Sequence, residues 1–426
     1  MLKFKHVLQP LRSIRATQQL VATRMDMRSF AERGERSFAH DPRYNLQSIT
    51  EGFASRLNTS DDDTALLDRI CTAYIATAAQ QHLENIAQQH TAPDVYKATR
   101  WWEEIQQRSL RPVMHALMTR DITALRAIYS NFFRDPCSTG LVSVPYGMTR
   151  NYFGSTMKDI HRRVYLSDTL YRIDHWQSRT EGRYPLHDLA TPDVGNPFGA
   201  LVDGTLVSVH SDFRHYCAHR LADLLQSGTS TVVEIGGGFG GTAYYLLRDR
   251  PGIKYLDFDV PESIALTSYY LMKALPHLTF LLYGEKPLTE ESISQVDVIL
   301  MPLFEMEKVP SSSVAITFSI HAMSDLSPEA LTCYLDNIER TTKDFFYSVG
   351  VDRAEPSMPS LIGQNYRSFR LKEKLPSGWH DHKFVSASEI ERLYRINQLN
   401  QSIKNQLDRS IKATRTNLGE HSYVDR

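Results

Sequence analysis

The stretch Thr231–Gly241, which reads TVVEIGGGFGG, gives the clearest indication of the fold. Its first five residues are rich in β-branched side chains, as is typical of a buried strand. A glycine-rich turn follows, and an apolar helix begins at its end. Strand, tight turn and helix together predict a nucleotide-cofactor cradle. Glycines let the backbone approach the ligand, and the helix N-terminus offers unpaired N–H groups.

Two interpretations of this turn compete. Gly236, Gly238 and Gly241 fit the dinucleotide pattern G-x-G-x-x-G. Glu234, Gly236, Gly238 and Gly240 fit E-x-G-x-G-x-G, the first motif of S-adenosylmethionine-dependent methyltransferases. A dinucleotide brings a pyrophosphate, whereas S-adenosylmethionine brings a sulfonium cation that a nearby acid would favour. Glu234 therefore favours S-adenosylmethionine, and a purely structural turn is the remaining alternative.

The next predicted strand, residues 253–259, carries a second acidic signal. Asp259 stands at its C-terminal end, where an acid can accept hydrogen bonds from ribose hydroxyls. Asp257 is the rival, because it shares a strand face with Asp259. Asp259 lies nearer the crevice in which ligands bind to open α/β sheets. Pro261 then opens the following helix, a position that favours proline.

Strands and helices alternate through the C-terminal half of the chain. We expect strands near 231–235, 253–258, 278–283, 296–301, 314–320 and 345–351, and helices near 241–249, 262–275 and 328–342. Such alternation predicts an α/β fold with a mostly parallel sheet covered by helices on both faces.

Composition limits the classes of function. A chain of 426 residues is long enough for two or three domains, and its apolar content of 42% suits globular cores. The net charge of −1 argues against a general nucleic-acid or membrane-surface role. No apolar run reaches the length of a membrane span, and no secretory core follows the N-terminus, so a cytoplasmic protein is expected. The four cysteines show no metal or redox spacing.

The pattern along the chain predicts a division into four segments. They are a basic N-terminal arm (1–40), a mainly helical substrate-side cap (41–194), an S-adenosylmethionine-binding α/β domain (195–385) and a helical tail (386–426). The helical prediction for the tail depends on apolar residues that recur at helical spacing, namely Ile390, Leu393, Ile396, Leu399 and Ile403. The tail is also a candidate surface for homo-oligomer formation.

His321 is the strongest candidate for a general base. It directly follows the predicted strand 314–320, so it should lie at the ligand-binding edge of the sheet. Imidazole accepts a proton near neutral pH. Asp325, four residues later, is a candidate to orient His321, to act as the base itself or to hold an acceptor hydroxyl. In the alternative interpretation, His321 bonds a loop and Asp325 caps the next helix.

Other residues are candidates for binding the cofactor or a metal. Arg214 and Tyr216 are expected to line the cofactor entrance, with Arg214 paired to the methionyl carboxylate, or else to belong to an ordinary amphipathic helix. Met301 could pack on adenine, although loop packing explains it equally well. His215 and His219 share a helix face, but no third-ligand signature accompanies them, so no metal is predicted.

Several of these segments resemble the bacterial family of sugar O-methyltransferases. The resemblance covers roughly residues 190–350. Its motifs are 234–241, 255–262, 266–271, 281–285, 195–199, 214–218, 321–326 and 345–349. The chain departs from the family pattern at Asp325, where glutamate is expected, and at Gly350, where asparagine is expected.

The resemblance implies a class I methyltransferase-like Rossmann sheet with a largely helical N-terminal domain. It also implies an S-adenosylmethionine-dependent O-methyltransferase acting on a hydroxyl of a sugar or glycosylated acceptor, with general-base assistance. The expected partner is then a small molecule or glycan, and neither nucleic acid nor a membrane. The alternatives are a non-sugar metabolite as acceptor, a nucleotide-dependent oxidoreductase or epimerase, and a binding protein without catalysis.

Overall fold

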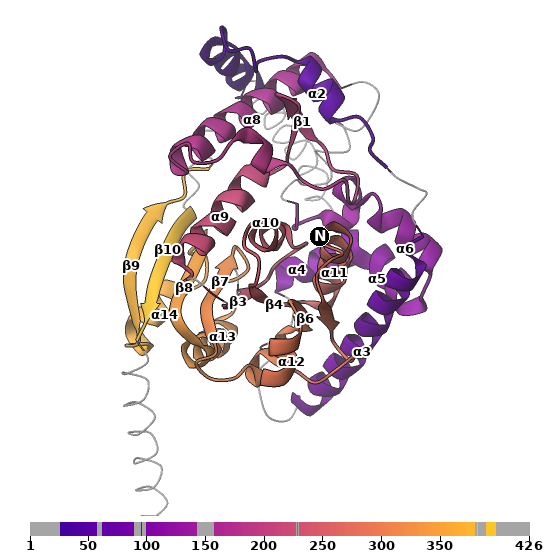
Figure 1. Cartoon of the computed structure of the whole chain (residues 1–426), viewed down its shortest axis with the longest axis vertical. Helices are drawn as coiled ribbons and strands as arrows, with labels where there is room; N and C mark the ends of the chain where they lie inside the picture. The colour runs from indigo at the N-terminus through magenta and orange to yellow at the C-terminus, as the bar shows by residue number, and fades with distance from the viewer. Residues whose placement is uncertain are drawn as a thin grey trace, which may run out of the picture. The chain divides into compact units, whose positions relative to one another are not determined.

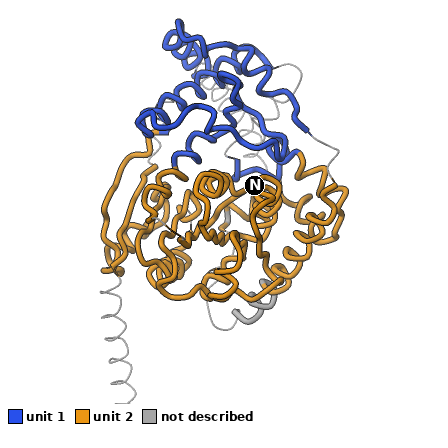
Figure 2. Tube along the Cα trace, viewed as in Figure 1, with its two compact units in different colours: residues 1–58, 131–216, 379–386 blue, residues 59–130, 217–378, 387–426 orange. Residues whose placement is uncertain are grey.

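The structure is a computed structural model. It describes residues 26–57, 62–88, 95, 99–142, 157–226, 228, 230–324, 326–379, 381 and 389–397. The chain divides into two compact units, coloured blue and orange in Figure 2. Unit 1 comprises residues 1–58, 131–216 and 379–386, and unit 2 comprises the remaining residues. No helix in the described part of the chain has both the length and the apolar character needed to cross a membrane.

Unit 2 contains a mixed sheet whose described strands follow the order β5-β6-β4-β3-β7-β8-β10-β9 (Figure 1). The strands are β3 (Thr231–Ile235), β4 (Lys254–Asp259), β5 (Phe280–Leu282), β6 (Val298–Pro302), β7 (Val314–Ile320), β8 (Thr342–Val351), β9 (Phe369–Pro376) and β10 (Glu389–Ile396). All neighbouring pairs from β5 to β8 are parallel, and β10 runs antiparallel to both β8 and β9. The predicted α/β class with a mainly parallel sheet is therefore confirmed.

Helices of unit 2 cover the sheet and extend into the N-terminal half of the chain. They are α3 (Thr64–Gln88), α4 (Arg100–Ile105), η1 (Gln106–Leu110), α5 (Arg111–Thr119), α6 (Ile122–Tyr129), α10 (Gly241–Asp249), α11 (Pro261–Ala274), α12 (Glu290–Gln295), η5 (Leu303–Lys308), α13 (Pro328–Thr341) and α14 (Met358–Asn365). A buried core of aliphatic and aromatic side chains joins β3, β4, β6 and β8 to α13 and α14. This burial is the main stabilising term for the sheet.

Unit 1 is mainly helical and contains a short hairpin. Its elements are α2 (Gln47–Gly52), η2 (Phe132–Arg134), η3 (Pro136–Ser138), α8 (Asp159–Arg179), η4 (Leu186–Leu189), β1 (Gly199–Val202) and β2 (Thr205–Ser208). Residues 26–37 are also helical. A buried ion pair between Arg172 and Asp212, with Nε 2.8 Å from Oδ2, crosses its interior. Helix α9 (Ser211–Leu224) belongs to unit 1 up to Tyr216 and to unit 2 from Cys217.

The units do not follow the predicted segment boundaries. Residues 59–130, expected in a separate cap, cluster with the sheet in unit 2. Helix α3 packs against α11 there, and Arg69 anchors it by donating to the Phe280 carbonyl at 2.7 Å. The predicted helix at the start of the C-terminal tail is wrong over Glu389–Ile396, which forms strand β10. Pairing to β8 and β9 on both sides overrides the helical spacing of its apolar residues.

Candidate active site

The turn after β3 has a backbone conformation that glycine adopts more readily than any other residue. Gly236, Gly238 and Gly240 all have positive φ, at 79°, 67° and 85°. Residues with a side chain rarely adopt this region. A Cβ on Gly237 would lie 2.5 Å from Oδ2 of Asp257, so this glycine is required for space instead. The Gly236 N–H donates to the Phe258 carbonyl and the Gly240 N–H donates to the Gly237 carbonyl, so the chain bends tightly into α10.

Two carboxylates of β4 accept hydrogen bonds from the backbone of this turn. Asp257 accepts from the Gly237 N–H at 3.1 Å, and Asp259 accepts from the Gly238 N–H at 2.9 Å and the Val260 N–H at 2.7 Å. The two differ in burial: Asp257 is 0% exposed, whereas Asp259 is only partly buried. Of the two rivals for the ribose contact, only Asp259 thus keeps surface that a ligand can reach.

Glu234 adds a third acid to the cluster. It is 2% exposed, accepts a hydrogen bond from the Tyr255 hydroxyl and stands opposite Asp257 in the β3–β4 register. Burial, together with the charge of Asp259, raises the pKa of Glu234 to about 8. Burial also raises the pKa of Asp259 to about 7, although backbone N–H groups oppose that shift. Three acids in this enclosure disfavour further negative charge and favour a cationic ligand.

His321 lies at the end of β7, where the sequence placed it. Its φ is 68°, an unusual conformation for a residue with a side chain, and its side chain is 49% exposed. The His321 N–H donates to the Val349 carbonyl at 2.7 Å, which fixes the residue against β8. This geometry presents an imidazole that is half exposed at the carboxyl end of β7.

Glu389 is the partner of His321, and sequence reasoning missed it. Nε2 of His321 hydrogen-bonds a carboxylate oxygen of Glu389, which is 7% exposed on β10. Ser377 donates from its hydroxyl to the other carboxylate oxygen of Glu389. A carboxylate accepts, so Nε2 carries the proton and Nδ1 carries the basic lone pair. Asp325, the partner expected from sequence, lies outside the described residues.

The two turns touch each other. A Cβ on Gly236 would lie 2.2 Å from Cβ of Ala322, the residue after His321. The absence of a side chain at Gly236 therefore lets the His321 turn approach the glycine turn. The acidic glycine turn and the turn that carries His321 are therefore neighbours at the carboxyl edge of the sheet.

Three other predicted site residues pack in the core or hydrogen-bond to other protein groups. Met301 is 1% exposed within the core cluster, so its side chain lines no open surface. Arg214 donates to the Val209 carbonyl at 2.7 Å, and the Tyr216 hydroxyl accepts from Arg179. Arg214 and Tyr216 belong to unit 1 and the glycine turn to unit 2. Their contact with a cofactor stays a prediction.

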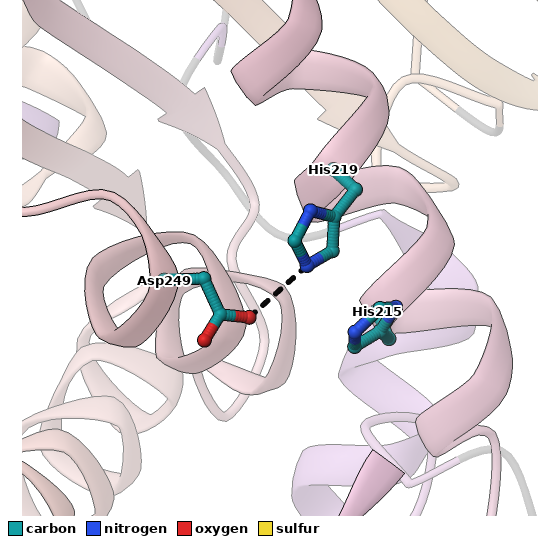
Figure 3. Close-up of side chains that lie close together, drawn as sticks. All are labelled: His215, His219 and Asp249. Atoms are coloured by element: carbon teal, nitrogen blue, oxygen red, sulfur yellow. Dashed lines mark hydrogen bonds and ion pairs between the residues drawn. The ribbon is translucent and has the colours of Figure 1, made fainter. Parts of the chain in front are cut away.

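The histidines of α9 are engaged by other groups. His219 pairs through Nε2 with Oδ2 of Asp249 at 3.1 Å, and His215 lies one turn earlier (Figure 3). Nδ1 of His215 accepts from the Trp176 indole N–H at 3.2 Å. An indole N–H can only donate, so the proton of His215 resides on Nε2. That tautomer has no lone pair at Nε2 for a metal, which argues against a metal role.

Comparison with known proteins finds similarity only at the level of structure. No protein-family model and no curated protein sequence matches the chain. A SAM-dependent methyltransferase from Aquifex aeolicus is 13% identical, with a TM-score of 0.29, over 42% of this chain and 88% of its own. Geranyl diphosphate C-methyltransferase from Streptomyces coelicolor A3(2) is 11% identical, with a TM-score of 0.31, over 54% of this chain and 97% of its own.

A Pyrococcus abyssi tRNA (uracil-54, C5)-methyltransferase in complex with S-adenosyl-L-homocysteine is a further similar structure. It is 13% identical, with a TM-score of 0.29, over 44% of this chain and 38% of its own. These solved structures are named as methyltransferases for different acceptors. Because the TM-scores and identities are low, the function proposed below rests on the residues of the site.

Proposed function

We propose that the protein is an S-adenosylmethionine-dependent O-methyltransferase whose acceptor is a sugar or a glycosylated molecule. The observation that carries this proposal is the contact between the acidic glycine turn and the His321 turn at Gly236 and Ala322. A cradle that favours a cation then adjoins a histidine ready to accept a proton. Methyl transfer to a hydroxyl needs both features in one place.

The residues of the cradle fit S-adenosylmethionine. The glycines of the turn carry no side chains, and Asp259 offers an acceptor for ribose hydroxyls. Burial raises the pKa values of Glu234 and Asp257, and a bound cation would favour the ionised form of both acids. When bound, S-adenosylmethionine supplies an electrophilic methyl group. A pyrophosphate at this turn would instead face three acids, which disfavours the dinucleotide interpretation.

His321 performs the proton transfer in this proposal. A sugar hydroxyl is a weak nucleophile, so its oxygen needs to lose its proton as the new C–O bond forms. Nδ1 of His321 takes that proton, and the resulting imidazolium is stabilised by Glu389 through Nε2–H. Burial of Glu389 strengthens this charge pairing, since the surroundings are less polarisable than water.

Calorimetric titration with S-adenosylmethionine, S-adenosylhomocysteine and NAD⁺ tests the cofactor assignment. We expect the two adenosyl compounds to bind and NAD⁺ not to bind. Methyl transfer is then measured from labelled S-adenosylmethionine to a panel of glycosides and to non-sugar alcohols and phenols. Binding of NAD⁺ in place of the adenosyl compounds would select an oxidoreductase, and transfer only to the non-sugar panel would replace the sugar acceptor.

A further inference from the structure

A polar pocket lies beside the His321 turn at the carboxyl ends of β7 and β8. It is small, because the centre of a water-sized sphere has only about 20 Å³ of space inside it. The lining polar and charged side chains are Ser319, Ser324, Ser348, Asp352, Arg353 and Arg392. The lining residue Ser324 belongs to the His321 turn, since its backbone N–H donates to the His321 carbonyl at 3.0 Å.

Arg392 is a buried cation on the wall of this pocket. It is 3% exposed, and among the described residues its hydrogen-bond partner is Asp352, which accepts from one terminal nitrogen. A guanidinium has five N–H donors in a rigid fork. Burying such a group is costly unless its donors are satisfied. The structure thus places the guanidinium of a buried arginine on the wall of a small pocket.

Two serines add hydroxyl groups to the same wall. Ser348 is 5% exposed, stands opposite Arg392 in the β8–β10 register, and its hydroxyl has no partner among the described residues. Ser324 accepts from the Val351 N–H at 3.1 Å, so its own hydroxyl hydrogen remains for donation. A buried hydroxyl without a partner costs free energy, which a ligand with acceptor oxygens would recover.

The charges of the pocket favour an anion. Arg353 and Arg392 outweigh Asp352 by one positive charge. The planar guanidinium fork matches a carboxylate, which can accept two parallel hydrogen bonds. We propose that this pocket binds a carboxylate group of the acceptor, so that the acceptor is an acidic sugar of the uronic acid class. The identity of the acceptor rests on the proposed function, whereas the binding of the carboxylate does not.

The binding test compares glucuronate, glucose, the methyl ester of glucuronic acid and glucose 6-phosphate by calorimetry, with S-adenosylhomocysteine present. We expect glucuronate to bind at least about tenfold more tightly than the other three, since only it offers a planar carboxylate to the fork. Equal affinities for glucuronate and glucose would overturn the proposal. Tighter binding of the phosphate would overturn it as well.

Ser348→Ala is the most informative variant. Its hydroxyl makes no hydrogen bond to a described residue, so the fold should tolerate the change, while glucuronate affinity should fall about tenfold. Ser208→Ala is the matched control, because Ser208 is a buried serine of β2 with the same lack of a partner. Arg392→Gln should abolish the preference for glucuronate. An equal change in glucuronate affinity in Ser348→Ala and Ser208→Ala would contradict the proposed carboxylate site.

The two proposals fail in different ways. Glucuronate binding without methyl transfer to any hydroxyl compound would remove the enzyme assignment and leave the carboxylate site. Methyl transfer to neutral glycosides without glucuronate binding would remove the carboxylate site and leave the enzyme assignment.

Discussion

The two turns that meet at the sheet edge are held in different ways. The turn after β3 is held by backbone N–H groups bonded to Asp257 and Asp259, which come from the adjacent parallel strand. The His321 side chain is held by Glu389, which comes from the antiparallel strand β10. The first contacts are made by backbone N–H groups, whereas the second contact is made by the imidazole with a carboxylate from a distant segment. Changes in the first region should therefore alter ligand binding, and changes in the second should alter turnover.

Replacing His321 should give the largest effect. We expect His321→Ala to lower kcat by about 10² to 10⁴-fold, the usual contribution of a general base, and to leave S-adenosylmethionine affinity within about twofold. Labelled methyl transfer and calorimetry measure the two quantities. Glu389→Gln should lower kcat less, because the histidine remains. A near-normal kcat in His321→Ala would contradict the assignment of turnover to the His321 turn.

The complementary change on the glycine side is Asp259→Ala. We expect the affinities for S-adenosylmethionine and S-adenosylhomocysteine both to fall about 10- to 100-fold, because the ribose of each ligand loses an acceptor for its hydroxyls. The kcat at saturating cofactor should change little. Asp259→Asn, which keeps an acceptor oxygen, is the matched control. Unchanged affinity in Asp259→Ala would move the ribose contact elsewhere.

The buried acids of the glycine side should also make stability depend on pH. Burial raises the pKa of Glu234 from 4.5 to about 8. Between those values the folded protein keeps a proton that the unfolded chain releases, so stability falls as pH rises through that interval. Glu234→Gln should flatten this fall and raise Tm by a few degrees at pH 9, while Glu104→Gln, at an exposed position, should not. Scanning calorimetry at pH 5 and pH 9 measures Tm for each protein. An equal change in Tm between the two pH values in the wild type and in Glu234→Gln would contradict a raised pKa of Glu234.

Removing the Ser377 hydroxyl should have the smallest effect. Ser377 donates its hydroxyl to Glu389, and in the proposed function it acts by positioning that carboxylate. Ser377→Ala should lower kcat about three- to tenfold with unchanged KM, and Ser377→Thr should restore it, since threonine keeps the hydroxyl. Nitrogen chemical shifts of the His321 ring report whether Nε2 still carries the proton. Loss of activity without any change in those shifts would assign Ser377 a merely structural role.

The same contrast explains which parts of the molecule could be predicted from sequence. The parallel core follows from local patterns: β3 and α10 begin and end at the predicted residues, and β4, β6 and β7 agree closely. The glycine turn could be predicted because its geometry depends on residues that are adjacent in the chain. His321 could be placed at a strand end for the same reason.

The partner of His321 could not be found in this way. Glu389 reaches it only because β10 pairs with β8, and the apolar residues Ile390, Leu393 and Ile396 also fit a helix. Strand β10 is mostly buried along its length, so the alternation that identifies a half-exposed strand is missing. The roles of Arg214 and Tyr216 could not be predicted, because the same helical spacing is expected for residues that pack within the protein and for residues that contact a ligand.

The close approach of Gly236 to Ala322 has a practical consequence for engineering new specificities. Any side chain at position 236 would collide with the turn that carries His321, because a Cβ there would lie 2.2 Å from the Ala322 methyl. Libraries aimed at new acceptors should keep glycine at position 236 and leave Glu389 of β10 unchanged.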